Sequence, residues 1–588
     1  MADLAAATRP VGDVTPSIRR RPAAATTDPG LAGLHPVLQR VYAARGVCSA
    51  GQVDHRLRHL AAPDSLGGLV RATQLLAAAL AAQQRIVVVG DFDADGATGT
   101  AVAVRGLRLL GACNVGFKVP NRAIHGYGLS PALVAELRGD APALLLTVDN
   151  GVAAHAGVAA ARAAGMRVIV TDHHLPGATL PDADALVDPC LPGDRFPSKA
   201  LAGVGVVFYL LLALRAHLRA VDWFGPTRPE PDLSVLLDLV ALGTVADLVP
   251  LDHNNRVLVA AGLRRMQAGA ANAGLRALIA VSGREPAKLQ AADLGFALAP
   301  RINAAGRLDD MAIGIQCLLC DDEAQALALA QRLDTINRER RVIQSDMQAQ
   351  AEALVAPWLA CDARALPAGV CLYDPAWHAG VVGLVASRLK DRLHRPVVAL
   401  APAEDDGAML KGSGRSVEGF HLRDALADLA AAEPDLMERF GGHAMAAGLT
   451  LPRVHLDRFV AAFAARAERA LGREPGLHLV ETDGALSAQE ANLELAALLA
   501  AAGPWGQGFP EPCFDGEFEL RGWRVMAERH LKLDLGWAAC GTPVEAVHFG
   551  GYAGHDPPAR LRLVYQLSID EWRGARRLRL LVRHAEPA

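Results

Sequence analysis

Acidic side chains follow three short apolar runs of the chain. They are Asp91, Asp93 and Asp95 after residues 86–89, Asp149 after residues 144–148, and Asp172 with His173 and His174 after residues 168–171. The carboxyl ends of parallel strands meet at one edge of a sheet, so these side chains are expected to converge. Crowded carboxylates repel one another unless cations neutralise them, and oxygen-rich sets with one or two imidazoles suit Mn²⁺ or Mg²⁺. Two such ions clamp a phosphate and activate a water, which is the chemistry of phosphoester hydrolysis.

Two other interpretations of the first acidic run are disfavoured. The pattern D-x-D-x-D-G at 91–96 also begins an EF-hand loop, but Val102 occupies the twelfth position, where that loop needs a glutamate. A dinucleotide-binding strand would be followed by G-x-G-x-x-G, which does not follow residues 86–89. Asp149 alone is equally typical of a ribose-binding or capping residue, so the metal interpretation depends on the three strand ends together.

The elements that must position these residues can be predicted from periodicity. Apolar runs alternate with helical stretches over about 60–260, which predicts a parallel sheet covered on both faces. Residues 233–249 predict a buried helix that ends near Asp247. A long amphipathic helix is expected over 321–356, ended by Pro357, and a second α/β region over about 360–470. Alternating runs at 560–569 and 576–584 predict a small β-barrel. The expected fold class is α/β with a C-terminal barrel.

Composition limits the location and the partners. The 588 residues carry a net charge of -4, so nucleic acid would have to bind local basic patches. Residues 1–30 fit no signal or transit peptide, and the longest uncharged apolar run, 200–214, is shorter than the ~18 residues of a spanning helix. We therefore expect a cytoplasmic protein outside the membrane. The nine cysteines are scattered, and the pair Cys317 and Cys320 is expected to lie in a structural core.

Four motifs occur in the order typical of the DHH superfamily of phosphoesterases, which the chain resembles: D-x-D-x-D-G (91–96), D-N-G (149–151), D-H-H (172–174) and G-T-V-A-D, which ends at Asp247. Further segments resemble the members of this superfamily that are exonucleases on single-stranded DNA. These are VPNR (119–122), GYGLS (126–130), LAGVGV (201–206), PRINAAGRLDD (300–310), KGSGRS (411–416), FGGHAMAAG (440–448) and GPWGQGFPEP (503–512). The resemblance covers about residues 40–588. It implies hydrolysis of single-stranded DNA from the 5′ end to mononucleotides with two divalent ions, Mn²⁺ or Mg²⁺, in recombination and repair.

The resemblance also implies an order of domains. It predicts a disordered tail (1–40), a DHH catalytic domain (41–270), a helical linker region (271–357), a DHH-associated α/β domain (358–474) and an oligonucleotide-binding (OB) barrel (475–588). In the barrel region, Trp505, Trp523, Phe549, Tyr565 and Trp572 alternate with arginines. This pattern is typical of a surface that stacks bases, and equally of an aromatic core with a basic outer face.

Roles of single residues are implied in the same way. The implied metal ligands are Asp91, Asp93, Asp95, Asp149, His173 and Asp247; Asp149 is the expected bridge, and Asp91 either binds metal or supports a ligand. His174 is implied beside the scissile phosphate as electrophile or acid, and Asp172 as the acid that orients a histidine. The residues implied to bind substrate phosphate are Arg122, Arg301, Ser413, Arg415 and His443. One departure is His125, which precedes GYGLS where relatives carry an acid.

The resemblance implies single-stranded DNA with a 5′ end as the substrate. It implies a single-stranded-DNA-binding protein and a RecQ-type helicase as partners, and a monomer. Two alternatives are weighed against it. Other hydrolases of the superfamily, which act on pyrophosphate, short oligonucleotides or cyclic dinucleotides, are typically shorter and lack the barrel. A non-catalytic DNA-replication scaffold would have lost motif acids, which are all present here.

Overall fold

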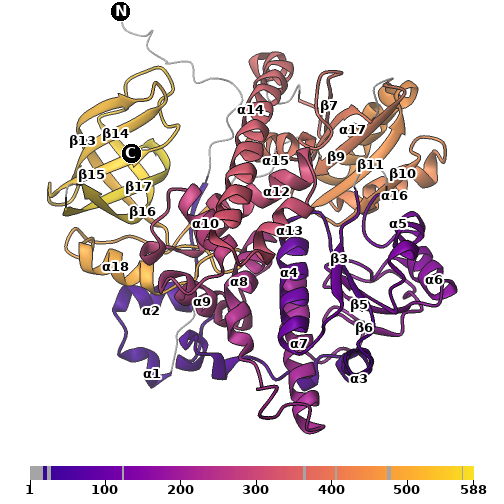
Figure 1. Cartoon of the computed structure of the whole chain (residues 1–588). Coiled ribbons are helices and arrows are strands. Elements are labelled where there is room, and N and C mark those ends of the chain that lie inside the picture. Colours follow the sequence, from indigo (N-terminus) through magenta and orange to yellow (C-terminus); the bar gives the residue numbers. More distant parts are fainter. Residues whose placement is uncertain are drawn as a thin grey trace, which may run out of the picture. The chain divides into compact units, whose positions relative to one another are not determined.

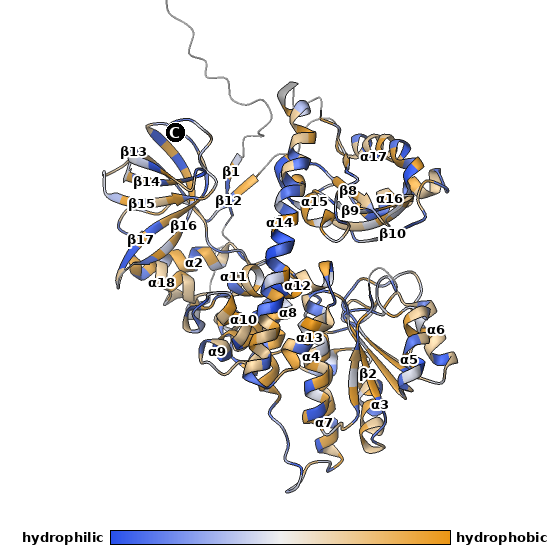
Figure 2. Cartoon of the chain, turned by 45° about the horizontal axis from the view of Figure 1, so that its top comes forward, coloured by the Kyte–Doolittle hydropathy of each residue, from blue (hydrophilic) through white to orange (hydrophobic). Residues whose placement is uncertain are grey.

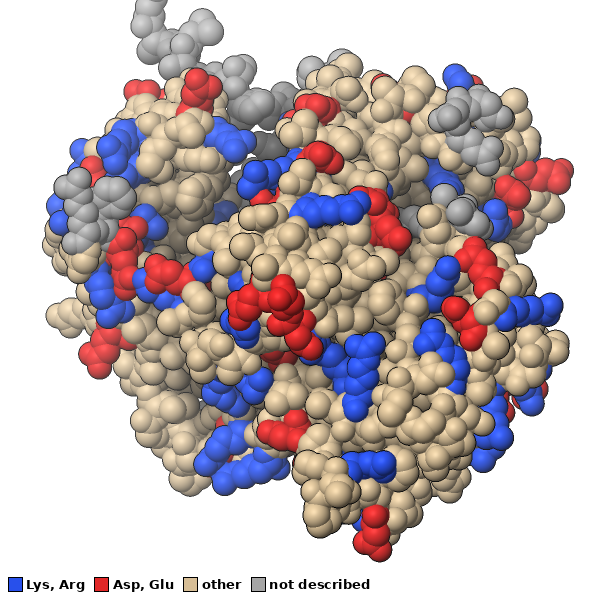
Figure 3. Space-filling view, viewed as in Figure 1, with Lys and Arg blue, Asp and Glu red and all other residues tan. Residues whose placement is uncertain are grey.

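The structure is a computed structural model that describes residues 17–22, 28–121, 125–361, 366–403, 407–472, 479–572 and 574–588. The chain divides into two compact units. The larger unit comprises residues 20–337 and 481–588, and the smaller unit comprises residues 1–19 and 338–480. On the face drawn in Figure 3, positive and negative side chains are interspersed, as the small net charge suggests.

A five-stranded parallel sheet lies in the larger unit (Figure 1). Its order is β3 (Val115–Lys118), β2 (Ile86–Val89), β4 (Leu144–Val148), β5 (Arg167–Thr171) and β6 (Ala185–Val187). The central strands are buried apolar runs and are hydrophobic in Figure 2. The chain order changes direction between β2 and β4, so a ligand crevice is expected beyond the carboxyl ends of these two strands.

Helices cover both faces of this sheet, as the sequence predicted. Ile86 and Val88 share a core with α3 (Leu69–Ala81), α4 (Ala94–Leu109) and α7 (Gly203–Ala220). Val87 and Val89 share the other core with α5 (Pro131–Leu137) and α6 (His155–Ala163). By length and composition α7 could cross a membrane, but 61% of its apolar window is buried inside the fold, as in the core helix of a soluble protein.

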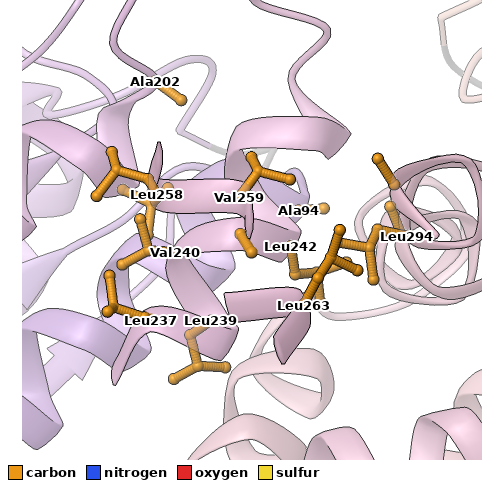
Figure 4. Packing of buried hydrophobic residues seen from close by; sticks show 14 of the residues in the cluster. Ala94, Ala202, Leu237, Leu239, Val240, Leu242, Leu258, Val259, Leu263 and Leu294 are labelled. Carbon is orange, nitrogen blue, oxygen red and sulfur yellow. The ribbon is translucent and has the colours of Figure 1, made fainter. Parts of the chain in front are cut away.

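A helical layer follows in the larger unit. Its helices are α8 (Leu237–Ala246), α9 (His253–Gln267), α10 (Ala273–Val281), α11 (Ala291–Asp293), α12 (Ala299–Leu308) and α13 (Ala312–Leu319). A π-helix, Leu294–Leu298, precedes α12. Figure 4 shows Leu237 and Val240 of α8 beside Leu258 and Val259 of α9. This packing explains why the run at 233–249 is apolar on every side.

The long helix α14 runs over Glu323–Cys361, and Pro357 lies inside it. The prediction that Pro357 ends this helix was therefore wrong. A proline removes one backbone donor and crowds the preceding turn. In a helix of 39 residues the other backbone hydrogen bonds maintain the helix despite the one that Pro357 removes.

The smaller unit contains a second five-stranded sheet of order β10 (Arg439–Gly442), β11 (Ala446–Pro452), β9 (Met409–Arg415), β8 (Val397–Pro402) and β7 (Val370–Tyr373). Only β7 and β8 pair in parallel among these strands of the described chain. Its helices are α15 (Val382–Leu393), α16 (Leu422–Ala432) and α17 (Leu456–Leu471). Phe459 and Phe463 of α17 anchor the core of this α/β unit.

The C-terminal region forms the predicted barrel. The strands β13 (Phe514–Met526), β14 (His530–Trp537), β15 (Pro543–His548), β17 (Ala575–Pro587) and β16 (Arg560–Trp572) close in that order. The pair β15 and β17 is parallel and the others are antiparallel. This is the arrangement of a five-stranded OB barrel. The helix α18 (Leu493–Ala501) precedes it.

The prediction that residues 1–40 form a disordered tail was wrong for the part that the structure describes. Residues 17–22 contain β1 (Ser17–Arg20), which pairs with β12 (Leu479–Thr482). Residues 28–40 contain α1 (Pro29–Ala32) and the start of α2 (Pro36–Ala43). Arg20 binds Asp515 and the apolar residues of α2 are buried. The Pro/Ala/Thr-rich stretches at 1–16 and 23–27, also predicted to be disordered, lie outside the described residues.

Candidate metal centre

The acidic loop, residues 91–95, joins β2 to the first turn of α4. Asp93 is the N-cap of α4, and its Oδ1 accepts a hydrogen bond from Gly96 N at 3.0 Å. A Cβ atom on Gly96 would lie 2.6 Å from Asp91 N, so only glycine permits this close return of the chain. The turn therefore brings the three aspartates of the acidic loop to the edge of the sheet.

Asp95 is buried and both of its carboxylate oxygens contact the first turn of α7. Oδ2 accepts from Gly203 N at 2.6 Å and Oδ1 accepts from Val204 N at 2.9 Å. The N-cap of α7 is Ala202, whose methyl group cannot accept a hydrogen bond, so Asp95 supplies that acceptor from another element. Burial raises the pKa of Asp95 to about 7, and the charge of Asp93 acts in the same direction. Each oxygen keeps a lone pair with which it could bind a cation.

Asp149 lies at the end of β4 with a φ of 62°, a left-handed conformation that is strained for any residue except glycine. Its N donates to Thr171 O at 3.1 Å, and its carbonyl accepts from the hydroxyl of Tyr127 at 3.1 Å. A Cβ on Gly203 would lie 2.6 Å from the Cβ of Asp149. The strained residue is thus held from three sides.

His173 faces three of the acids with one ring nitrogen. Its Nε2 lies 3.0 Å from Asp149 Oδ1, 3.5 Å from Asp247 Oδ2 and 4.0 Å from Asp95 Oδ2. Asp247 is the residue that ends α8. The second, third and fourth motifs therefore meet at one point with the acidic loop.

His174 is held by Asp172. The distance from His174 Nδ1 to Asp172 Oδ1 is 2.7 Å, and Asp172 Oδ2 accepts from Val152 N at 2.9 Å. Burial acts to lower the pKa of His174, but the bond to Asp172 and the surrounding negative charges raise it to about 9. Burial acts to raise the pKa of Asp172, yet the bond to His174 holds it below its usual value. An imidazolium paired with a carboxylate results.

These side chains fit a pair of divalent cations. Their candidate ligand atoms lie within 4.8 Å of one another in three overlapping groups: Asp91, Asp93 and Asp149; Asp95, His173 and Asp247; and Asp149, His173 and His174. Asp149 and His173 each belong to two groups. Burial, followed by the charges of neighbouring aspartates, raises the pKa of Asp149 and of Asp247 well above the usual range. Divalent cations would relieve this repulsion, and oxygen ligands with imidazole suit Mn²⁺ or Mg²⁺.

The residues predicted to bind substrate phosphate are distributed over both units. Arg122 lies outside the described residues. Arg301 of α12 forms an ion pair with Asp334 of α14, with 2.8 Å between Nη2 and Oδ1. Arg415 of β9 donates from Nη1 to Ser413 Oγ at 3.0 Å. His443 lies in the turn between β10 and β11, where its N donates to Ala446 O at 2.7 Å.

The first turn of α15 lies against Ser413 and Arg415. A Cβ on Gly383 would be 2.8 Å from Ser413 Oγ and 3.1 Å from Arg415 Nη2. The N-cap of α15 is Val381, whose side chain cannot accept a hydrogen bond. An arginine, a hydroxyl and a helix N-terminus therefore meet in the smaller unit, a combination suited to an anion.

Several contacts around the acids were missed by sequence reasoning. They come from Tyr127 to Asp149, from the backbone of Gly203 and Val204 to Asp95, and from Asn303 Oδ1 to Ala94 N at 2.8 Å. These residues belong to the segments GYGLS, LAGVGV and PRINAAGRLDD. The segments themselves were therefore the available signal, although nothing in them indicates the partner atoms.

The aromatic residues of the barrel region divide into two groups. Tyr565 is fully buried, so it belongs to the aromatic core and does not stack bases, whereas Trp505 is half-buried and packs against Phe509 at the edge of the core. Phe549 is 61% exposed, and Trp523 stacks on Tyr552. The side chain of Trp572 lies outside the described residues. An aromatic core thus accounts for part of the pattern.

Comparisons with known proteins agree with this architecture. The DHH family, N-terminal domain, matches residues 85–244, the DHHA1 domain matches residues 366–469, and the RecJ OB domain matches residues 482–584. The single-stranded-DNA-specific exonuclease RecJ of Dickeya dadantii is 50% identical over 98% of this chain and 100% of its own length. The RecJ of Escherichia coli is 48% identical over 97% of this chain and 99% of its own length.

Solved structures give the same result. The crystal structure of RecJ in complex with Mn²⁺ from Thermus thermophilus matches with a TM-score of 0.79 and 33% identity, over 95% of this chain and 77% of that chain. A crystal structure of exonuclease RecJ bound to manganese matches with a TM-score of 0.58 and 38% identity, over 69% of this chain and 96% of that one. The chain belongs to the RecJ family of single-stranded-DNA-specific exonucleases, within the DHH proteins.

Proposed function

We propose that this chain is an exonuclease that hydrolyses single-stranded DNA from its 5′ end and releases 5′-mononucleotides with the help of two divalent cations. The observation that carries the proposal is the convergence of the four acidic motifs around Asp149 and His173. Membership of the RecJ family supports the substrate class, and Mn²⁺ and Mg²⁺ are the ions in the RecJ structures that match it.

The residues that would hold the ions are Asp91, Asp93, Asp95, Asp149, His173 and Asp247. Bound ions would neutralise the phosphate charge and supply a hydroxide at neutral pH. The chain itself fixes His174, because Asp172 binds Nδ1 and so sets the orientation of the ring. In the metal-free protein burial acts against protonation, but the bond to Asp172 raises the pKa of His174 to about 9, so the ring is protonated there at neutral pH. It can therefore stabilise charge on the phosphate or give a proton to the leaving oxygen.

Residues other than the metal ligands must recognise the 5′ end, because metal ions bind all internal phosphodiesters in the same way. A terminal phosphate carries more charge and one more free oxygen than an internal diester. Ser413, Arg415 and the first turn of α15 form a site of the right chemistry for it. We assign Arg122, Arg301 and His443 to the remaining phosphate contacts. The barrel is assigned to holding the strand farther from the cleaved end.

Finer assignments also belong to this proposal. We place the protein in the cytoplasm as a monomer. We expect it to act with a single-stranded-DNA-binding protein and with a RecQ-type helicase, which would supply the single strand that the enzyme consumes.

The decisive experiment follows nucleotide release from single strands labelled at the 5′ or the 3′ end, with Mn²⁺, Mg²⁺ or EDTA. We expect early release of a labelled mononucleotide from the 5′-labelled strand, with Mn²⁺ or Mg²⁺ alone. Release from the 3′ end, or hydrolysis restricted to pyrophosphate and dinucleotides, would overturn the proposal. A protein that binds single strands but does not cleave them would support the scaffold alternative.

A further inference from the structure

The segment PRINAAGRLDD holds more than the phosphate-binding candidate Arg301. Most of it forms α12, in which Asn303 and Gly306 are three residues apart and therefore lie on one face. Both contact the acidic loop. The side-chain oxygen of Asn303 accepts from Ala94 N at 2.8 Å, and a Cβ on Gly306 would lie 1.9 Å from the carbonyl oxygen of Phe92.

These two contacts lie on either side of Asp93, one at the preceding residue and one at the following residue. Ala94 is the first residue of α4, and its N–H is one that the helix itself leaves unsatisfied. The local cap does not serve it, because the Asp93 side chain accepts from Gly96 N. Gly306 has no side chain, so the backbone of α12 lies directly on the Phe92 carbonyl.

A second helix also fixes the acidic loop. Asp95 is bound by the backbone of α7, and Gly96 lies against the backbone of Asp91. The acidic loop is consequently bound by two helices, by α12 through the backbone of Ala94 and Phe92 and by α7 through the carboxylate of Asp95. Residues that fix metal ligands in this way commonly change metal affinity or activity by 10–100-fold when they are replaced.

We propose that α12 is a clamp on the acidic loop and that Asn303 is a positioning residue for its metal-binding carboxylates. The inference rests on the proposed metal-dependent function and deepens it. Asn303 contacts no reacting group; it acts through Ala94 N, which fixes the direction in which Asp93 and Asp95 leave the backbone.

The test uses full-length protein without DNA and measures Mn²⁺ binding by titration calorimetry. Asn303→Ala should raise the Kd for Mn²⁺ about 10–100-fold with the number of sites unchanged. Hydrogen exchange in EDTA should become faster in the peptide that covers residues 91–97. At saturating Mn²⁺, kcat should fall while KM for single strands stays the same.

A matched control is Asn272→Ala. Asn272 also caps a helix of the larger unit, where its Oδ1 accepts from Leu275 N at 2.7 Å in α10. This variant should lose stability and exchange faster near residue 275, but its Kd for Mn²⁺ should stay at the wild-type value. An equal loss of Mn²⁺ affinity in both variants would show that Asn303 contributes only to folding and would overturn the clamp.

A second pair of variants tests the backbone contact. Gly306→Ala forces a methyl group into the Phe92 carbonyl, whereas Gly295→Ala meets only Val245 Cγ1 at an ordinary 3.4 Å. Gly306→Ala should weaken Mn²⁺ binding and Gly295→Ala should not. If Gly306→Ala fails to fold, Asn303→Ala decides. Wild-type Mn²⁺ affinity and exchange in Asn303→Ala would refute the clamp, whereas a wild-type protein that binds no Mn²⁺ would instead refute the proposed function.

Discussion

Replacing Asp172 with asparagine should lower the pKa of His174 in the metal-free protein from about 9 towards its ordinary value of 6.5. The Oδ1 of Asp172 lies 2.7 Å from His174 Nδ1, and this bond contributes most to raising the pKa. Asparagine keeps the shape and one acceptor oxygen but loses the charge. The difference between about 9 and 6.5 corresponds to ~3 kcal/mol of stabilisation of the imidazolium.

The same substitution should change the dependence of stability on pH. Because the pKa of His174 is higher in the folded protein than in the unfolded chain, the stability from this pair is fully present below pH 6.5 and is lost as the pH rises through 9. Asp172→Asn should therefore lower the free energy of unfolding by up to ~3 kcal/mol at pH 6. At pH 10 the part of this cost that depends on the imidazolium should be gone, and only the loss of the acceptor for Val152 N should remain.

The assay is an NMR titration of protein with ¹³C-labelled histidine in EDTA, with His174→Gln used to assign the signal. Urea unfolding at pH 6 and pH 10 measures the stability. Asp238→Asn is the matched control, because Asp238 is a buried acid of α8 whose Oδ1 accepts from Leu239 N. A His174 pKa that stays near 9 in Asp172→Asn, or that falls equally in the control, would refute the reasoning.

The other predictions concern the metal site, the 5′ end, pH and the packing of the barrel region. Asp149→Ala should lower kcat by at least ~10³, about 4 kcal/mol of barrier, while single-strand binding persists; full activity would contradict a two-ion site. Arg415→Ala should remove ~1.5–3 kcal/mol of preference for 5′-phosphate over 5′-hydroxyl strands, measured as kcat/KM, and an equal fall on both would transfer the role to Arg301. Burial raises the pKa of Asp95 to about 7. In the metal-free protein, the stability that protonated Asp95 contributes should therefore be complete below pH 3.8 and lost as the pH rises through 7. Thermal unfolding in EDTA should show this loss, and Mn²⁺ should reverse it. Arg45→Ala should cost ~3–5 kcal/mol in urea unfolding, because Arg45 lies 2.7 Å from the fully buried Asp483 carboxylate. A cost under ~1 kcal/mol would show that the other partners of this carboxylate, Arg21 and Cys513 N, compensate its charge.

The placement of the strand-end acids could be predicted because it needs only one rule. Asp91, Asp149 and Asp172 each follow an apolar run, and parallel strands end at the same edge. Asp247 ends a helix, so no strand pattern leads to it, and only the resemblance to the DHH superfamily suggested its role. Its position 3.5 Å from His173 depends on how α8 packs against α4 and α7, which periodicity does not specify.

The contacts that hold the acids could not be predicted, because they use backbone atoms of distant segments. Asn303 and Ala94 are 209 positions apart in the sequence, and neither residue type indicates that a hydrogen bond joins them. The prediction that the N-terminal segment is disordered failed for a similar reason. Its composition is typical of disorder, but Arg20 has a carboxylate partner in the barrel strand β13, and composition cannot reveal a partner so far along the chain.

The conformation of Asp149 shows what the metal centre requires of the fold. The left-handed backbone conformation costs a residue other than glycine ~1–3 kcal/mol of strain, and asparagine or glycine would adopt it with less strain. The carboxylate of Asp149 lies 3.0 Å from His173 and beside the acidic loop, where the proposed metal site needs negative charge. The strain persists because Thr171 and Tyr127 bind its backbone and Gly203 leaves room for its Cβ. The same Gly203 donates to Asp95, so one residue of α7 sets the positions of two carboxylates. Divalent ions of this kind bind oxygen over a narrow range of distance, near 2.0–2.1 Å for Mg²⁺. Small residues around the acids therefore matter to metal binding as well, because a side chain added at Gly203 would displace Asp149 and one added at Gly96 would displace Asp91.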